Sequence, residues 1–192
     1  MGNIFSLRFP AYQPYDDNDS IKKHMEKLAK SYCKKVKANW NKTMALEVSK
    51  DEDIIPLLQA APVNELEILI IHGIKLEERE KEDCLSLQGV SNLTLVIEHN
   101  KTLKGFGFIR NHIDIDKATI LCHSLCHLPA IEIISFWDNQ IDSKTADHII
   151  DIVKRIPTLK ELNLGANLFI DGPEKEERLR NDGYQFRLRF SN

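Results

Sequence analysis

Apolar and polar positions repeat with a period of 28 residues through the middle of the chain. Leu103, Ile131 and Leu159 each open a segment with apolar residues three and five positions later and an asparagine eight positions later. The alternation predicts a short strand that points every second side chain into a core. The asparagine comes where the chain leaves the strand, and we expect it to satisfy backbone groups that the turn leaves unpaired.

A second apolar set with the same period predicts one helix in each repeat. Spacings of three and four mark one face of a helix. These residues are Val90, Leu93 and Ile97, then Ala118, Leu121 and Leu125, then Ala146, Ile149 and Val153. Pro129 and Pro157 follow two of the helices at equivalent places, and Asp114 and Ser143 are the expected helix caps. Each repeat is therefore predicted to be a strand, a turn and a helix.

The segment Thr158–Asn167 resembles the consensus of the leucine-rich repeat family, in its ribonuclease-inhibitor-like class. The resemblance extends over roughly residues 53–190 and implies a short α/β solenoid. Its parallel strands would line the concave side and its helices the convex side. We expect residues 1–50 to hold a lipidation signal and a basic amphipathic helix that caps the repeats, and residues 51–192 to form the repeat domain.

The two ends of the repeat array are irregular. Leu66–Ile71 predicts the first strand, after a helix near residues 54–60. A charged run between residues 75 and 89 is interpreted as a solvated insertion, with an acidic docking loop as the alternative. Tyr184–Phe190 alternates and predicts a closing edge strand.

Residues between the core positions of each strand are expected to point out of the concave face. Exposed apolar surface is typical of binding sites, and a tryptophan flanked by charge is a typical interface anchor. We therefore predict a protein-binding patch centred on Trp137. The patch consists of Ile70, His72, Ile109, Arg110, Ile133, Ser135, Trp137, Asp138 and Asn163. The alternative is that the amino-terminal segment folds back over this face, or that Trp137 covers the edge of the core.

The chain starts with Met1–Ser6, which fits the M-G-x-x-x-[ST] pattern for attachment of myristate to Gly2. This start resembles that of the ADP-ribosylation factor GTPases. The GTPase function is not implied, because the chain has no G-x-x-x-x-G-K-[ST] phosphate loop. A single myristoyl chain binds membranes only marginally, so stable anchoring needs a second signal.

A basic segment supplies a candidate for that second signal. From Ser20 to Met44 the chain has eight lysines and one acid, a local charge of +7, and apolar residues recur every three or four positions. This pattern predicts a basic amphipathic helix with Ser20 as its cap. The lysines expected to face an anionic membrane are Lys22, Lys23, Lys27, Lys30, Lys34, Lys35 and Lys37. Alternatively, the apolar stripe packs on the first repeat and the lysines face water.

Composition and motifs exclude several classes of function. The net charge of −3 argues against nucleic-acid binding by the whole surface. The first residues do not fit the pattern of a secretory signal, so we expect the four cysteines to be reduced in a cytosol. The run Cys122–His127 does not have the ligand spacing of a zinc site, and we expect ordinary helix residues there and no metal. Because no motif of catalysis is present, we expect neither a cofactor nor a small-molecule substrate.

The sequence thus predicts a monomeric, non-catalytic protein-interaction module at the cytosolic face of a eukaryotic membrane. Because myristoylation takes place in eukaryotic cytosol, the protein is interpreted as eukaryotic or as a bacterial effector secreted into a host cell. Two alternatives follow from branches of the same repeat class. One is a GTPase-activating protein or another regulator of a small GTPase, with Arg110 as the candidate finger. The other is an actin-capping or scaffold protein.

Overall fold

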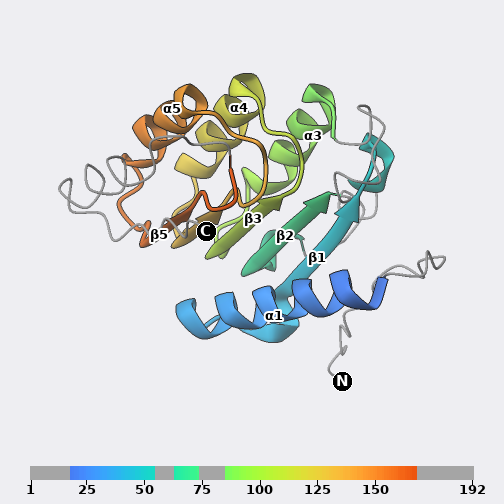
Figure 1. Ribbon diagram of the computed structural model, residues 1–192. Helices are drawn as coiled ribbons and strands as arrows, with labels where there is room; N and C mark the ends of the chain where they lie inside the picture. Colours follow the sequence, from blue (N-terminus) through green and yellow to red (C-terminus); the bar gives the residue numbers. More distant parts are fainter. Residues whose placement is uncertain (1–17, 55–62, 74–84, 168–192) are drawn as a thin grey trace.

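The protein, described here as a computed structural model, is built around one five-stranded parallel sheet (Figure 1). The structure describes residues 18–54, 63–73 and 85–167. The strands follow one another across the sheet in the order of the sequence. They are β1 (Thr43–Val48), β2 (Ile68–Gly73), β3 (Gly105–Ile109), β4 (Ile133–Ser135) and β5 (Glu161–Asn163).

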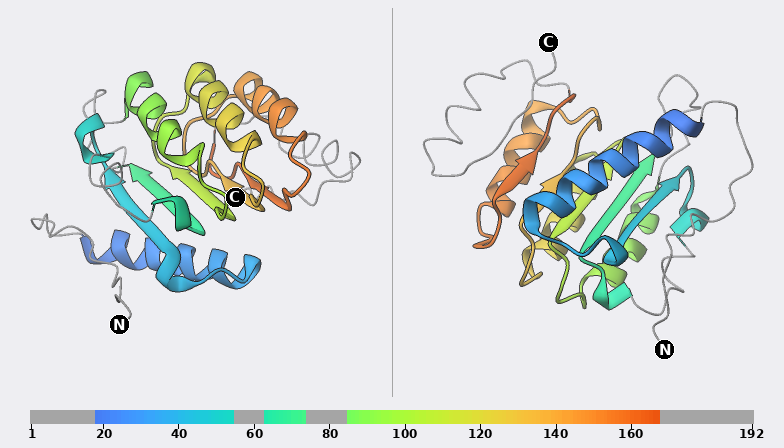
Figure 2. Two further views of the ribbon diagram at one scale, coloured as in Figure 1. Left: turned by 180° about the vertical axis from the view of Figure 1, so that it is seen from behind. Right: turned by 90° about the horizontal axis from the view of Figure 1, so that it is seen from below.

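The helices cover the two faces of the sheet unequally (Figure 2). On one face lie α3 (Leu87–Ile97), α4 (Ile115–Cys126) and α5 (Ser143–Val153), and on the other lies α1 (Asn18–Val36). Short 3-10 helices lie in the connections before and after β1: η1 (Trp40–Lys42), η2 (Asp51–Ile54) and η3 (Val63–Glu65). In the described ranges no helix combines the length and apolar character needed to cross a bilayer.

The principal core lies between the sheet and α3, α4 and α5. Phe106 and Phe108 of β3 both belong to it, with ring centroids 6.3 Å apart, and Phe136 joins them just after β4. The nine apolar helix positions predicted from the 28-residue period are all buried in this core. The chain therefore has an α/β repeat-like fold, which is consistent with a leucine-rich-repeat-like architecture.

The predicted asparagines form a ladder of hydrogen bonds across the strand exits. Asn139 accepts a hydrogen bond from the backbone N–H of Asn111 at 2.6 Å, and Asn167 accepts one from the backbone N–H of Asn139 at 2.9 Å. Each side-chain amide also donates to carbonyl groups of its own strand exit and of the strand exit before it. Their predicted structural role is confirmed.

The backbone repeats as closely as the side chains do. The residues just before the three asparagines, Arg110, Asp138 and Ala166, have φ angles of 57°, 58° and 57°. A left-handed residue at this point turns the chain sharply out of each strand. Asp114 caps α4 as predicted, whereas α5 is capped by Asp142, one residue before the expected Ser143.

β1 is a strand that the 28-residue pattern does not predict. It pairs in parallel with β2, from Thr43 opposite Ile68 to Val48 opposite Gly73. One edge of the sheet therefore comes from the stretch assigned above to the amino-terminal segment. The predictions for Gly2, for the helix near 54–60, for most of the insertion and for the strand at 184–190 lie outside the described residues.

Candidate functional site on the α1 face of the sheet

The residues predicted to point away from the core do lie on the face opposite α3, α4 and α5. Strand pairing aligns them in rows across the sheet, and we call this surface the α1 face. The first row consists of Thr43, Ile68, Gly105, Ile133 and Glu161, and the second of Ala45, Ile70, Gly107, Ser135 and Asn163. The predicted strand register is therefore correct.

The expectation that this face is exposed is wrong, because α1 covers it. Ile70 and Ile109 have no exposed surface and Ile133 is 2% exposed, and His72 and Ser135 are equally buried. The physical reason is the cost of exposed apolar area, about 25 cal/mol per Å², which an amphipathic helix in the same chain removes. The alternative prediction, an amino-terminal segment folded back over the face, is confirmed.

α1 approaches the sheet closely because β3 has glycines on this face. A side chain at Gly105 would place its Cβ 2.7 Å from Cδ1 of Ile68 and 3.6 Å from Cδ2 of Tyr32. The ring of Tyr32 occupies the space left free and extends toward Ser135 on β4. Burial raises the pKa of the Tyr32 phenol above its ordinary value. Tyr32 is therefore the main apolar anchor of α1 among the described residues.

The carboxyl end of α1 is held by polar contacts as well. Lys35 Nζ lies 2.6 Å from a carboxylate oxygen of Glu161 on β5, and Cys33 Sγ lies 3.2 Å from Oγ1 of Thr43 on β1. The helix stops at Lys37, which has a φ of 52°, and the N–H of Ala38 donates to the Cys33 carbonyl at 3.0 Å. This is the hydrogen bond of a Schellman motif, which ends the helix and directs the chain toward β1.

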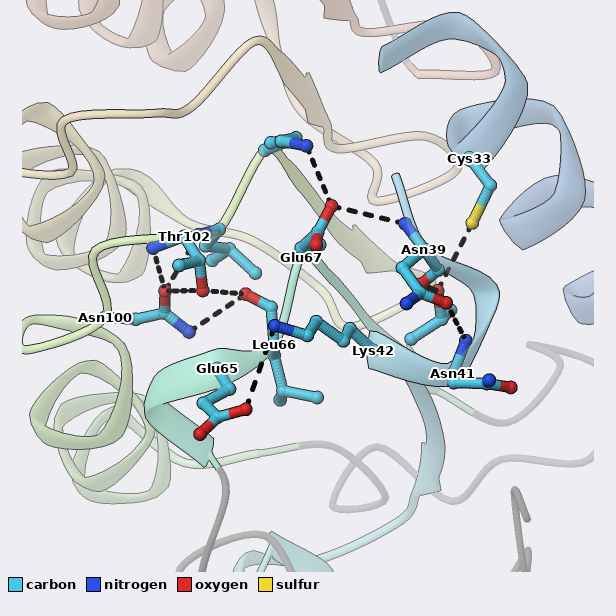
Figure 3. Close-up of polar contacts among 12 residues, drawn as sticks. Cys33, Asn39, Asn41, Lys42, Glu65, Leu66, Glu67, Asn100 and Thr102 are labelled. Atoms are coloured by element: carbon cyan, nitrogen blue, oxygen red, sulfur yellow. Dashed lines mark hydrogen bonds and ion pairs between the residues drawn. The ribbon is translucent and has the colours of Figure 1, made fainter. Parts of the chain in front are cut away.

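The connection between α1 and β1 is tied to the starts of two further strands (Figure 3). The backbone N–H of Asn39 donates to Glu67, just before β2, and Lys104, just before β3, pairs with the same carboxylate at 2.8 Å. Partial burial of Glu67 opposes its ionisation, but these hydrogen bonds outweigh it and lower the pKa of the carboxyl. Lys42 lies 3.7 Å from Glu65 beside them. The position of α1 is therefore fixed from the strand-entry edge.

Three of the predicted binding residues meet at the carboxyl ends of β3 and β4, on the side of the sheet opposite the strand-entry edge. Arg110 Nε lies 2.6 Å from Oδ2 of Asp138, and the guanidinium lies 5.3 Å from the ring centroid of Trp137. All three side chains are partly exposed, and Trp137 packs against the apolar cluster beneath α1. We call Arg110, Trp137 and Asp138 the strand-exit cluster. Asn163 on β5 is also partly exposed, and its side chain accepts from the N–H of Gly165.

The outer side of α1 is basic. Lys30 pairs with Glu26 and lies 5.7 Å from the ring centroid of Trp40, and Lys35 pairs with Glu161. Three further exposed lysines form no ion pair with any residue that the structure describes: Lys27, Lys34 and Lys37. The side chains of Lys22 and Lys23 lie outside the description. The described part of α1 thus presents uncompensated positive charge away from the sheet.

The run of cysteines and histidines in α4 is built into the helix layer. Cys122 is buried, and burial raises the pKa of its thiol. Cys126, expected to be exposed, is half-buried because α4 packs against α5 there, and its thiol donates to the Ile152 carbonyl at 3.5 Å. Within residues 18–54, 63–73 and 85–167, no three histidine, cysteine or acidic side chains are grouped as metal ligands.

Comparisons with known proteins concern the fold. No family model and no curated protein matches the sequence. A solved structure of a protein from Bacteroides fragilis is similar, with 17% identity and a TM-score of 0.52 over 78% of this chain and 40% of that chain. A solved structure of leiomodin-1 actin-binding site 2 matches with 19% identity and a TM-score of 0.47 over 59% of this chain and 68% of that chain.

Proposed function

We propose that the chain is a short leucine-rich-repeat protein that binds a protein partner and performs no catalysis. The 28-residue units of strand, turn and helix and their asparagine ladder support the family assignment. The strand-exit cluster is the observation on which the function rests. It combines a partly exposed tryptophan with an arginine and an aspartate, beside an apolar cluster. Tryptophan and arginine are the residue types enriched at the energetic centres of interfaces.

The geometry of the strand-exit cluster favours binding because its side chains are already ordered. The ion pair with Asp138 and the cation–π contact with the Trp137 ring hold the guanidinium of Arg110 in one place. Ordering such side chains on association costs about 0.5–1.5 kcal/mol each, and this cost is reduced here. The same ion pair opposes use of Arg110 as a GTPase finger, since the guanidinium would first have to leave Asp138.

Trp137→Ala is expected to weaken partner binding by at least about 30-fold, as loss of an interface anchor does. The free energy of unfolding should fall by only about 1 kcal/mol, because the ring is partly exposed. Affinity purification with native and variant protein, followed by calorimetry with the purified partner, measures the first quantity. Leu95→Ala is the control, since Leu95 is 62% exposed on α3, on the opposite side of the sheet. Partner binding that survives Trp137→Ala would show that the cluster is not the site.

A second candidate function, membrane association, is favoured by the uncompensated lysines of α1. We propose that these lysines and a myristoyl group on Gly2 hold the protein on the cytosolic face of a eukaryotic membrane. Each lysine near an anionic surface contributes about 1 kcal/mol, screened by salt. Reversing Lys27, Lys34 and Lys37 to Glu should therefore lower partition onto phosphatidylserine vesicles at least about 100-fold at low salt.

The control for this prediction reverses three exposed lysines elsewhere in the structure, Lys50, Lys101 and Lys144. It makes the same change in net charge, so a fall of less than about tenfold is expected if position matters. Equal losses in the two triple variants would rule out a specific role for α1. Intact mass of the protein from eukaryotic cells, beside Gly2→Ala, tests the lipid separately.

A further inference from the structure

Four exposed lysines on the outer side of α1 lie in line, and we call them the lysine stripe. They are Lys27, Lys30 and Lys34 within α1 and Lys37 directly after it. At about 100° per residue, the three lysines within the helix fall inside an arc of about 60° around its axis. The centre of this arc lies about 160° from the side of α1 that packs on the sheet through Ala29, Tyr32 and Val36. The stripe therefore points away from the sheet.

The positive charge of the lysine stripe is largely uncompensated within the described residues. Glu26 pairs with Lys30 at 3.4 Å, but the Lys30 side chain remains 65% exposed. The other three lysines of the stripe form no ion pair with a described residue. The carboxylate of Glu161 is paired with Lys35, outside the stripe. Among the residues that the structure describes, three unit charges therefore remain without a counter-charge on one side of a helix.

The shape and residue type of the lysine stripe fit a membrane surface better than a protein or a single phosphate group. Lys27 and Lys34 stand about 10 Å apart along the helix axis, so the stripe forms a line of charges that do not converge on one point. Such a line meets several lipid headgroups at once. Lysine is depleted at protein–protein interfaces, whereas the anionic lipids of a cytoplasmic leaflet attract it.

Trp40 borders the end of the lysine stripe. Its ring is partly exposed and packs against the apolar cluster beneath α1, and Lys30 Nζ lies 5.7 Å from the ring centroid. The ring therefore lies between that cluster and a lysine of the outer side. An indole combines an apolar ring with a polar N–H, and tryptophan is enriched where a membrane meets water. A tryptophan beside a line of lysines is thus suited to an anionic bilayer surface.

We propose that the protein lies on an anionic membrane with the axis of α1 parallel to the bilayer, the lysine stripe against the headgroups and Trp40 among them. The inference rests on the proposed membrane association and adds its orientation and an aromatic contact. In this orientation the sheet lies above α1, and α3, α4 and α5 lie farthest from the membrane (Figure 2). Trp137 packs against the cluster beneath α1, so a helix about 10 Å thick separates it from the headgroups.

Two single-tryptophan variants of the full chain test this orientation. The chain has two tryptophans, so Trp137→Phe leaves Trp40 as the only indole, and Trp40→Phe leaves Trp137. Each variant is mixed at low salt with vesicles of phosphatidylserine and a phosphatidylcholine that is brominated near the headgroup end of its acyl chains. Bromine quenches indole fluorescence only at close range. Co-sedimentation measures the bound fraction, and quenching is compared at equal bound fractions.

In the bound protein, the emission of Trp40 should fall by at least about half, because an indole at the headgroup level lies close to the bromine atoms. The emission of Trp137 should fall by less than about a tenth, because α1 lies between it and the membrane. Bound protein with unquenched Trp40, or with equal quenching of the two tryptophans, would overturn the orientation and leave the membrane association standing. Absence of sedimentation with the vesicles would overturn both proposals and favour an acidic protein as the partner of the lysine stripe.

Discussion

Asn139→Ala is expected to lower the free energy of unfolding by about 3 kcal/mol. The substitution leaves the residues of the strand-exit cluster unchanged. Asn139 is buried, accepts from the N–H of Asn111 at 2.6 Å and donates to the carbonyl of Phe108 at 2.7 Å. Alanine leaves a buried donor and a buried acceptor with one partner fewer, and each such loss costs about 1–3 kcal/mol. Urea unfolding followed by circular dichroism measures the change.

Asn167→Ala is the matched comparison, because it removes the next asparagine of the same ladder. Asn167 accepts from the N–H groups of Asn139 and Ile141, but it is only partly buried. Water can replace part of the hydrogen bonding of its side chain. We therefore expect Asn167→Ala to lower the free energy of unfolding by at least about 1 kcal/mol less than Asn139→Ala does. A loss below about 1 kcal/mol for Asn139→Ala would mean that the ladder is not what stabilises the strand exits.

The asparagine ladder could be predicted from the sequence because repetition constrains it. Three segments in one register require equivalent residues to occupy equivalent places, so Asn111, Asn139 and Asn167 had to stack. The same argument placed the strand residues on the correct faces of the sheet. β1 could not be found this way, since it lies before the periodic part and has no asparagine at its exit.

The covering of the α1 face could not be derived from periodicity, although signals for it were present. Gly105 and Gly107 stand two positions apart in a predicted strand, a pattern that indicates the close approach of another element. The apolar stripe of the predicted amino-terminal helix also needed an apolar partner, and the isoleucines predicted to point out of the sheet needed a cover. The sequence therefore predicts this contact only as an alternative, because the pairing of the two apolar surfaces is a property of the folded chain.

Charged residues at the strand-entry edge also contribute to the register of the sheet. Glu67 pairs with Lys104, and Glu132 pairs with Lys160 at 2.6 Å, so opposite charges alternate at equivalent positions before β2, β3, β4 and β5. Only the alignment of the strands shows that these residues are neighbours. The pairs are partly exposed and contribute little individually, but they favour the observed register.

Tyr32→Ala is expected to weaken the docking of α1 by about 3–5 kcal/mol, the usual cost of removing a large buried aromatic side chain. Tyr32 is 2% exposed, and its ring fills the space above Gly105. Tyr32→Phe should change docking by less than about 1 kcal/mol. Among the described residues neither the Tyr32 hydroxyl nor that of Ser135 makes a hydrogen bond of good geometry, so phenylalanine loses little.

Native-state hydrogen exchange measures this docking, because it reports local opening as well as global unfolding. In Tyr32→Ala the amides of α1 should exchange about 150-fold to 4,000-fold faster, as a loss of 3–5 kcal/mol implies, whereas those of β3 and α4 should change little. The difference is expected because the core beneath α3, α4 and α5 contains no residue of α1. Faster exchange across the whole sheet would instead make α1 an integral part of the fold.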